Sequence, residues 1–184
     1  MTNVAVVVIG VLSLVNFTLT FAVIRQVRRY GEQLAVRGAG RGQPPWHMQA
    51  GSPVPEFTAA TVSGGRVSLS DLTGARSMVA FFAVGCPPCR MQLPEFTRYA
   101  RSFPGGAAQV LAVVVETEGE REETAGDYVR ELVGVATVVV EPRGGPTAQA
   151  FSVSGQPTIY VLDERGRVET SGMAVRQVAA AATT

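Results

Sequence analysis

The most apolar part of the chain is residues 4–24, a run of 21 positions without a charged side chain. A helix of this length spans about 31 Å, which matches the hydrocarbon thickness of a bilayer. A cleavable signal peptide would need a basic leading region and a small-x-small cleavage site, and neither is evident. A buried core helix seldom runs so far without a charge. We therefore predict an uncleaved transmembrane anchor within residues 1–30.

A stretch rich in glycine and proline follows the apolar segment. Residues 38–45 hold three glycines and two prolines, which would break any helix that continued from the membrane. Residues 31–52 are therefore predicted to form a juxtamembrane linker. His47 is the only histidine and lies in this linker without neighbouring metal-ligating residues, so we expect it to be exposed and inert.

The remaining residues, 53–184, alternate strand-like and helix-like segments. Continuous apolar runs predict buried strands, and apolar residues at helical spacing predict amphipathic helices. The predicted strands are 77–84, 110–115 and 136–141, the helices are 86–103, 121–133, 146–151 and 175–182, and two hairpins cover 57–69 and 158–171. This order predicts a single α/β domain over residues 53–184, built in layers around a sheet.

Charge and cysteine content narrow the possible chemistry. The net charge is +1, which argues against a nucleic-acid binder that relies on phosphate contacts. All 16 basic residues are arginines, so lysine-based catalysis is excluded. Residues 1–50 hold five Arg and one Glu, whereas residues 51–184 hold eleven Arg and fourteen acids. Two cysteines are too few for a disulfide framework or a cysteine-rich zinc site.

Both cysteines lie in one C-x-x-C motif, Cys86-Pro87-Pro88-Cys89, where a predicted buried strand becomes a helix. The unpaired N–H groups and the positive dipole end of a helix start stabilise a thiolate there. Cys86 is therefore the expected nucleophile, at the exposed helix start, and Cys89 the more buried resolving thiol. Pro87 and Pro88 stiffen the loop, remove N–H donors and are expected to face the substrate.

Other interpretations of the motif fit less well. Half of a zinc site would lack its remaining ligands, and a structural disulfide across so short a loop would constrain little. A peroxiredoxin would place a threonine three residues before its reactive cysteine, and Ala83 holds that position. A redox-inactive binding module with the same fold remains an alternative, because a fold alone does not establish activity.

A second short segment accompanies the motif. Gly155-Gln156-Pro157-Thr158 directly precedes an apolar strand. We predict a cis Gln156–Pro157 bond, which would press the proline ring against the C-x-x-C. The same bond would turn the backbone of Gln156 outward to pair with an extended substrate segment.

These segments together resemble the thioredoxin fold, specifically the membrane-anchored TlpA/ResA-like thiol-disulfide oxidoreductases, over roughly residues 51–173. The resemblance implies a central mixed sheet flanked by helices, with Cys86 as nucleophile, Cys89 as resolving thiol and Pro157 as the cis-proline. The stretch Arg25-Gln26-Val27 is similar to MauD-type members, which assist disulfide formation. The motifs that carry the family resemblance are Gly51-Ser52-Pro53-Val54-Pro55-Glu56-Phe57, Leu69-Ser70-Asp71-Leu72, Cys86-Pro87-Pro88-Cys89-Arg90, Leu93-Pro94-Glu95-Phe96 and 151–158.

Two positions depart from the family pattern. Relatives commonly have tryptophan before the first cysteine, where this chain has Gly85. Relatives often have a glutamate three residues after the second cysteine, where Gln92 cannot titrate.

The expected function is therefore a membrane-tethered reductase of protein disulfides, with a MauD-type oxidase as the alternative. No cofactor motif is present, so electrons would pass by thiol exchange with a membrane thiol donor or acceptor. The resemblance places the domain outside the cytoplasm, on a single-pass anchor through residues 4–24. The arginines that follow this segment favour the opposite orientation under the positive-inside rule.

Overall fold

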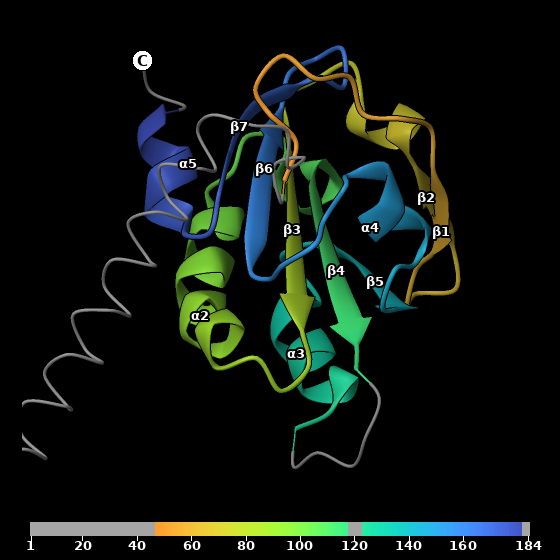
Figure 1. Cartoon of the computed structure of the whole chain (residues 1–184), viewed down its shortest axis with the longest axis vertical. Coiled ribbons are helices and arrows are strands. Elements are labelled where there is room, and N and C mark those ends of the chain that lie inside the picture. The colour runs from red at the N-terminus through yellow and green to blue at the C-terminus, as the bar shows by residue number, and fades with distance from the viewer. Residues whose placement is uncertain (1–46, 118–122, 182–184) are drawn as a thin grey trace, which may run out of the picture. The chain divides into compact units, whose positions relative to one another are not determined.

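A five-stranded mixed sheet organises the part of the chain that the computed structural model describes, residues 47–117 and 123–181 (Figure 1). The strand order is β5-β4-β3-β6-β7. The strands are β3 (Ser77–Ala83), β4 (Val110–Glu116), β5 (Thr137–Pro142), β6 (Thr158–Leu162) and β7 (Val168–Gly172). β3, β4 and β5 run parallel, whereas β6 pairs antiparallel with both β3 and β7.

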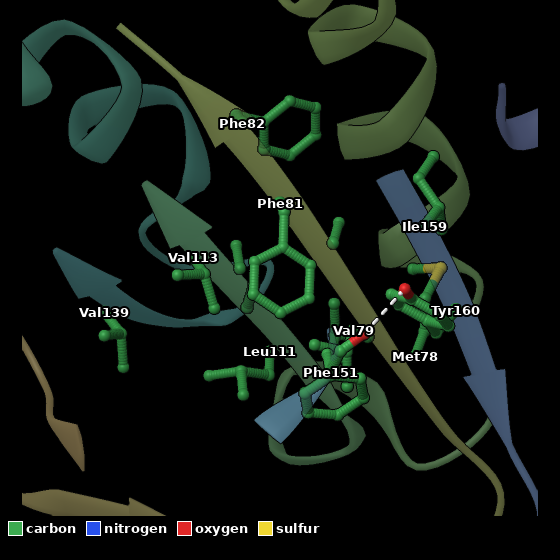
Figure 2. Packing of buried hydrophobic residues seen from close by; sticks show 14 of the residues in the cluster. Met78, Val79, Phe81, Phe82, Leu111, Val113, Val139, Phe151, Ile159 and Tyr160 are labelled. Atoms are coloured by element: carbon green, nitrogen blue, oxygen red, sulfur yellow. Dashed lines mark hydrogen bonds between the residues drawn. The ribbon is translucent and has the colours of Figure 1, made fainter. Parts of the chain in front are cut away.

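The central strand β3 is buried along its whole length, with all seven residues shielded from solvent. A strand that is covered on both faces has a continuous apolar sequence rather than an alternating one. Successive side chains still point to opposite faces. Phe81 packs on Phe151 with ring centroids 5.4 Å apart, while Phe82 packs on Phe96 at 5.2 Å. Figure 2 shows Phe81 beside Phe151, whose carbonyl accepts a hydrogen bond from Tyr160.

Helices cover both faces of the sheet. The long helices are α2 (Pro87–Arg101), α3 (Ala125–Leu132) and α5 (Val175–Ala181), and a short α4 (Pro146–Ala150) precedes β6. α2 contacts α3 and α5, so these three lie on the face that Phe82 occupies. α4 contacts β1 on the opposite face (Figure 1). The 3-10 turns η1 (Leu69–Leu72) and η2 (Gly106–Gln109) complete the helical elements among the described residues.

The first hairpin stands apart from the main sheet. β1 (Thr58–Ala60) and β2 (Arg66–Ser68) form an antiparallel pair, as the sequence predicts. They make a two-stranded sheet of their own, and Thr61, just after β1, forms an isolated antiparallel bridge with Val139 of β5. The N–H of Val62 donates to the Val138 carbonyl at 2.9 Å.

The predicted α/β architecture with a central mixed sheet flanked by helices is confirmed. The predicted helix 121–133 is shorter in the structure, because α3 begins at Ala125 behind a capping box made by Thr124 and Asp127. The predicted anchor lies outside the described residues. Within residues 47–117 and 123–181, no helix has the length and apolar character needed to cross a membrane.

Met48 and Gly51 tie the segment before β1 to the sheet. The N–H of Met48 donates to the hydroxyl of Tyr160 at 3.2 Å, and the N–H of Gly51 donates to the Val168 carbonyl at 2.7 Å. His47 precedes this segment and is half-buried, so the expectation of an exposed histidine is wrong. Burial lowers the pKa of His47 below its ordinary value.

Candidate active site

The turn between β3 and α2 carries the C-x-x-C motif. Gly85 has a φ of 69°, in the left-handed region that glycine adopts without strain. Cys86 is the N-cap of α2 and is extended, with a φ of −103° and a ψ of 104°. A residue with a side chain would be strained in this backbone conformation.

The two cysteines occupy different environments, as predicted. Cys86 is half-buried at the helix start, whereas Cys89 lies one turn into α2 with no exposed surface. A disulfide joins them, with the Cα atoms 5.2 Å apart. The backbone N–H of Ala83 lies 3.5 Å from the sulfur of Cys89, at the end of β3. An incoming sulfur atom can therefore reach Cys86 far more easily than Cys89.

The first turn of α2 presents a single backbone donor to the Cys86 sulfur. Pro87 and Pro88 hold the first two helical positions, are both exposed and have no N–H group. The N–H of Cys89 is therefore the first that the helix offers, and it points at the sulfur of Cys86 at 3.2 Å. The next, that of Arg90, donates to the Cys86 carbonyl at 3.1 Å. In the reduced protein the Cys89 N–H would stabilise a Cys86 thiolate.

The predicted cis peptide bond between Gln156 and Pro157 is confirmed. The carbonyl oxygen of Gln156 lies 3.7 Å from the sulfur of Cys86. Pro157 is buried and Gln156 is half-buried, just before β6, which pairs with β3. The antiparallel register of β3 and β6 brings this turn beside the motif, although 70 residues separate the two in sequence.

Gln92 and Glu95 face the C-terminal helix. The side-chain oxygen of Gln92 accepts a hydrogen bond from the N–H of Val175, the first residue of α5, at 3.2 Å. Glu95 lies 3.6 Å from Arg176 in an ion pair. Gln92 therefore caps α5 with its amide, in the position where relatives often carry an acid.

A group of charged and hydrogen-bonded side chains beside the motif was missed by the sequence reasoning. We call it the Glu123 cluster: Glu123, Arg90, Tyr128 and Glu131. One oxygen of Glu123 accepts from the N–H of Gly85 at 3.2 Å and from the Tyr128 hydroxyl at 3.0 Å. Its other oxygen lies 3.3 Å from Arg90, which also pairs with Glu131 at 2.7 Å. Glu123 thus contacts the residue before Cys86 and the residue after Cys89.

Tyr128 supports this cluster from within the core. The Arg90 guanidinium stands 5.6 Å from the centre of the Tyr128 ring. Burial, and then the hydrogen bond and negative charge of Glu123, raise the pKa of Tyr128 well above its ordinary value. The phenol therefore stays neutral and donates to Glu123 throughout the physiological range.

The acidic run over residues 116–123 was expected to form a solvated loop and helix start. For Glu123 that expectation is wrong, because its side chain is only 25% exposed and has three partners. No sequence signal separates Glu123 from the neighbouring glutamates, since its role depends on the packing of α3 against α2. Across residues 47–117 and 123–181, no three His, Cys, Asp or Glu side chains gather as a metal site would require.

Comparison with known proteins agrees with this geometry. The chain is 29% identical to the thioredoxin-like protein YneN and 28% identical to the thiol-disulfide oxidoreductase ResA, both of Bacillus subtilis. Each alignment covers 66% of this chain, with 70% of YneN and 65% of ResA, so the chain spans about two-thirds of these relatives.

A solved structure shows the same fold. The thioredoxin domain of a thiol-disulfide oxidoreductase from Bacteroides vulgatus superposes with a TM-score of 0.58 at 22% identity. The superposition covers 74% of this chain and 96% of that domain. The sequence pattern of the AhpC/TSA family matches residues 50–171, which hold the motif and the cis-proline. The chain therefore belongs to the AhpC/TSA family of thioredoxin-like proteins and has thiol-disulfide oxidoreductases among its relatives.

Proposed function

We propose that the chain is a membrane-tethered thiol-disulfide oxidoreductase that reduces disulfides in proteins through Cys86 and Cys89. The observation that carries this proposal is the asymmetry of the pair. Cys86 is half-exposed at the start of α2 with a backbone donor on its sulfur, while Cys89 is buried within reach behind it. A nucleophile needs access and a stabilised thiolate, whereas a resolving thiol needs only to reach the first sulfur.

The reaction begins with the pair in its dithiol form. The Cys86 thiolate attacks a substrate disulfide, one substrate sulfur leaves and takes a proton, and a mixed disulfide forms. Cys89 then loses its proton and attacks the Cys86 sulfur, which releases the second substrate thiol. The substrate gains two electrons and two protons, and the chain is left with the Cys86–Cys89 disulfide seen in the structure. A dithiol donor at the membrane would reduce this disulfide again.

The substrate is proposed to bind across the exposed rim of the site. Pro87 and Pro88 are exposed next to Cys86 in the chain, and the carbonyl oxygen of Gln156 lies 3.7 Å from the Cys86 sulfur. An extended peptide beside Gln156 would place its disulfide next to Cys86. This arrangement suits a cysteine in a flexible segment of a protein substrate.

Insulin reduction tests the activity. Wild-type protein supplied with dithiothreitol should precipitate the insulin B chain faster than dithiothreitol alone, and Cys86→Ser should abolish that gain. Equal rates for the two proteins would contradict catalysis. Equal rates would instead support a redox-inactive binding module. The presence of Gln92 where relatives often have a glutamate favours that alternative.

The direction of electron flow is tested separately. A glutathione titration of the Cys86–Cys89 pair should give a reduction potential near that of thioredoxin, about −270 mV, if the protein is a reductase. A value near that of DsbA, about −120 mV, would support the MauD-type oxidase instead.

The membrane anchor and the orientation rest on sequence alone. The uncharged residues 4–24 support a single span, and the resemblance to membrane-anchored TlpA/ResA-like proteins leads us to propose an extracytoplasmic domain. Fusion of alkaline phosphatase, which is active only outside the cytoplasm, to residue 184 should give an active enzyme. Activity of a fused cytoplasmic reporter alone would contradict this orientation and agree with the arginines that follow the span.

A further inference from the structure

The turn that carries Cys86 is held from the side by a partly exposed network of charges, in which the side chain of Glu123 is 25% exposed and that of Arg90 is 46% exposed. Glu123 accepts a hydrogen bond from the N–H of Gly85, the residue directly before Cys86. The same carboxylate pairs with Arg90, the residue directly after Cys89. Both contacts cross 33 residues or more of sequence, and they bracket the C-x-x-C motif from its two ends.

The Glu123 cluster has a net negative charge. It holds two carboxylates, Glu123 and Glu131, against the single guanidinium of Arg90, and Tyr128 is neutral. Among the described residues, the Gln156 turn adds no charged side chain, and the Glu95–Arg176 pair between α2 and α5 is neutral as a whole. The uncompensated charge therefore lies on the side of the site that Glu123 occupies.

We propose that Glu123 is a positioning residue that sets the reduction potential of the Cys86–Cys89 pair by holding negative charge against the turn in front of Cys86. The inference rests on the proposed redox function. In the reduced state Cys86 can ionise, and a nearby carboxylate opposes that ionisation. The disulfide has no charge and is not affected in this way. Glu123 therefore favours the disulfide and makes the dithiol a stronger reductant.

The reduction potential is expected to depend on the position of Glu123 and not only on the net charge of the Glu123 cluster. Glu131 pairs with the Nη1 atom of Arg90, whereas Glu123 pairs with its Nε atom, and within the described residues no hydrogen bond joins Glu131 to the C-x-x-C motif. Removing either carboxylate changes the cluster charge by the same amount. Only the removal of Glu123 takes the charge away from the Gly85 N–H.

The test measures the equilibrium of the full chain with glutathione. Two glutathione thiols give two electrons and two protons to the Cys86–Cys89 disulfide, yielding the dithiol and one glutathione disulfide. Glu123→Gln removes the charge and keeps an oxygen that can accept from Gly85 and Tyr128. Glu131→Gln is the matched control.

We expect Glu123→Gln to raise the equilibrium constant for reduction about threefold to tenfold, the size of one charge acting at short range near a protein surface. This corresponds to an upward shift of about 15 to 30 mV. The shift should grow as the pH rises through the ionisation of Cys86, and the pKa of the Cys86 thiol, read from thiolate absorbance, should fall. Glu131→Gln should give less than half of the shift.

Two results would overturn the inference. The first is a reduction potential of Glu123→Gln equal to that of wild type. This holds even if the substitution lowers the melting temperature, since Glu123 would then have only a structural role. The second is an equal shift in Glu131→Gln. Either result leaves the proposed function intact if wild type still reduces insulin and Cys86→Ser does not. If wild type and Cys86→Ser reduced insulin equally, the proposed function itself would be contradicted.

Discussion

The backbone N–H of Cys89 points at the sulfur of Cys86 across 3.2 Å. It is the first N–H that α2 can offer, because Pro87 and Pro88 have none. The second cysteine of the motif therefore acts on the first through its backbone as well as through its sulfur. A substitution of the Cys89 side chain leaves this donor in place.

The reactivity of the two thiols follows from this arrangement. In the reduced protein at neutral pH, iodoacetamide should alkylate Cys86 at least tenfold faster than Cys89, because Cys86 is accessible and its thiolate is stabilised. Peptide mass spectrometry after short exposures measures both rates. In urea the two rates should converge. Faster alkylation of Cys89 in the folded protein would contradict the assignment of Cys86 as nucleophile.

Gln92 offers a gain-of-function test. Gln92 and Cys89 are three residues apart on α2, so their side chains share one helix face. Gln92→Glu keeps an oxygen that can accept from Val175 and adds a group that can take the proton of Cys89. We expect insulin reduction to become severalfold faster. Glu95→Gln, which removes the partner of Arg176, should leave the rate unchanged.

The expected increase in the rate of insulin reduction by Gln92→Glu can be contradicted directly. A rate equal to or below that of wild type, with an unchanged melting temperature, would show that proton removal from Cys89 does not limit the reaction. Circular dichroism of both variants verifies that the helix content is unchanged.

Buried Glu141 is expected to be a stabilising residue. The residue is 4% exposed, and its carboxylate accepts from the N–H groups of Thr147 and Ala148 at 3.1 and 2.8 Å. Glu141→Ala leaves both buried donors without this acceptor, which costs about 2 to 4 kcal/mol of unfolding free energy. Urea denaturation measures the loss. Exposed Glu164, changed to Ala, should lose less than about 0.5 kcal/mol, and equal losses would contradict this role.

Tyr160 makes the stability sensitive to alkaline pH. Burial raises the pKa of Tyr160 to about 12, against a smaller opposing effect of the Met48 N–H. The fold thus favours the neutral phenol, and this contribution is complete below the unfolded pKa of about 10. It is lost as the pH rises from about 10 to about 12, at up to about 1.4 kcal/mol per pH unit.

Tyr160→Phe isolates that contribution. In urea titrations between pH 9 and 12, the variant should lose unfolding free energy with pH less steeply than wild type. Tyr128 remains in both proteins, so its own alkaline titration cancels in the comparison. The same slope in both proteins would show that Tyr160 does not couple ionisation to folding.

The sequence was sufficient for most of the fold because each element has a local signal. The unbroken apolar run of β3 predicts a strand covered on both faces, and Phe81 and Phe82 pack on opposite sides of it. The strand before Cys86 and the helix after it place the motif at a helix start. The Gln156-Pro157 pair directly before an apolar strand predicts the cis bond, in agreement with the family resemblance, and the structure contains it.

Features that depend on packing between distant elements were not predictable. Glu123 lies in a run of similar acids, and only the contact of α3 with α2 brings it to Gly85 and Arg90. The β1–β2 hairpin has a local signal, but its bridge from Thr61 to Val139 of β5 joins residues far apart in the sequence and has none. His47 was expected to be exposed because it lies in the predicted linker without other metal-ligating residues, yet it is half-buried.

The most direct test of the account is a trapping experiment with single-cysteine variants. Reduced Cys89→Ser keeps the nucleophile and the backbone N–H at residue 89 but cannot resolve a mixed disulfide. Mixed with oxidised insulin, it should accumulate a covalent adduct that dithiothreitol releases, and intact-mass spectrometry should place the insulin chain on Cys86. Cys86→Ser should form no adduct under the same conditions. Adducts on Cys89 in Cys86→Ser, or none in Cys89→Ser, would contradict the central claim that Cys86 attacks protein disulfides.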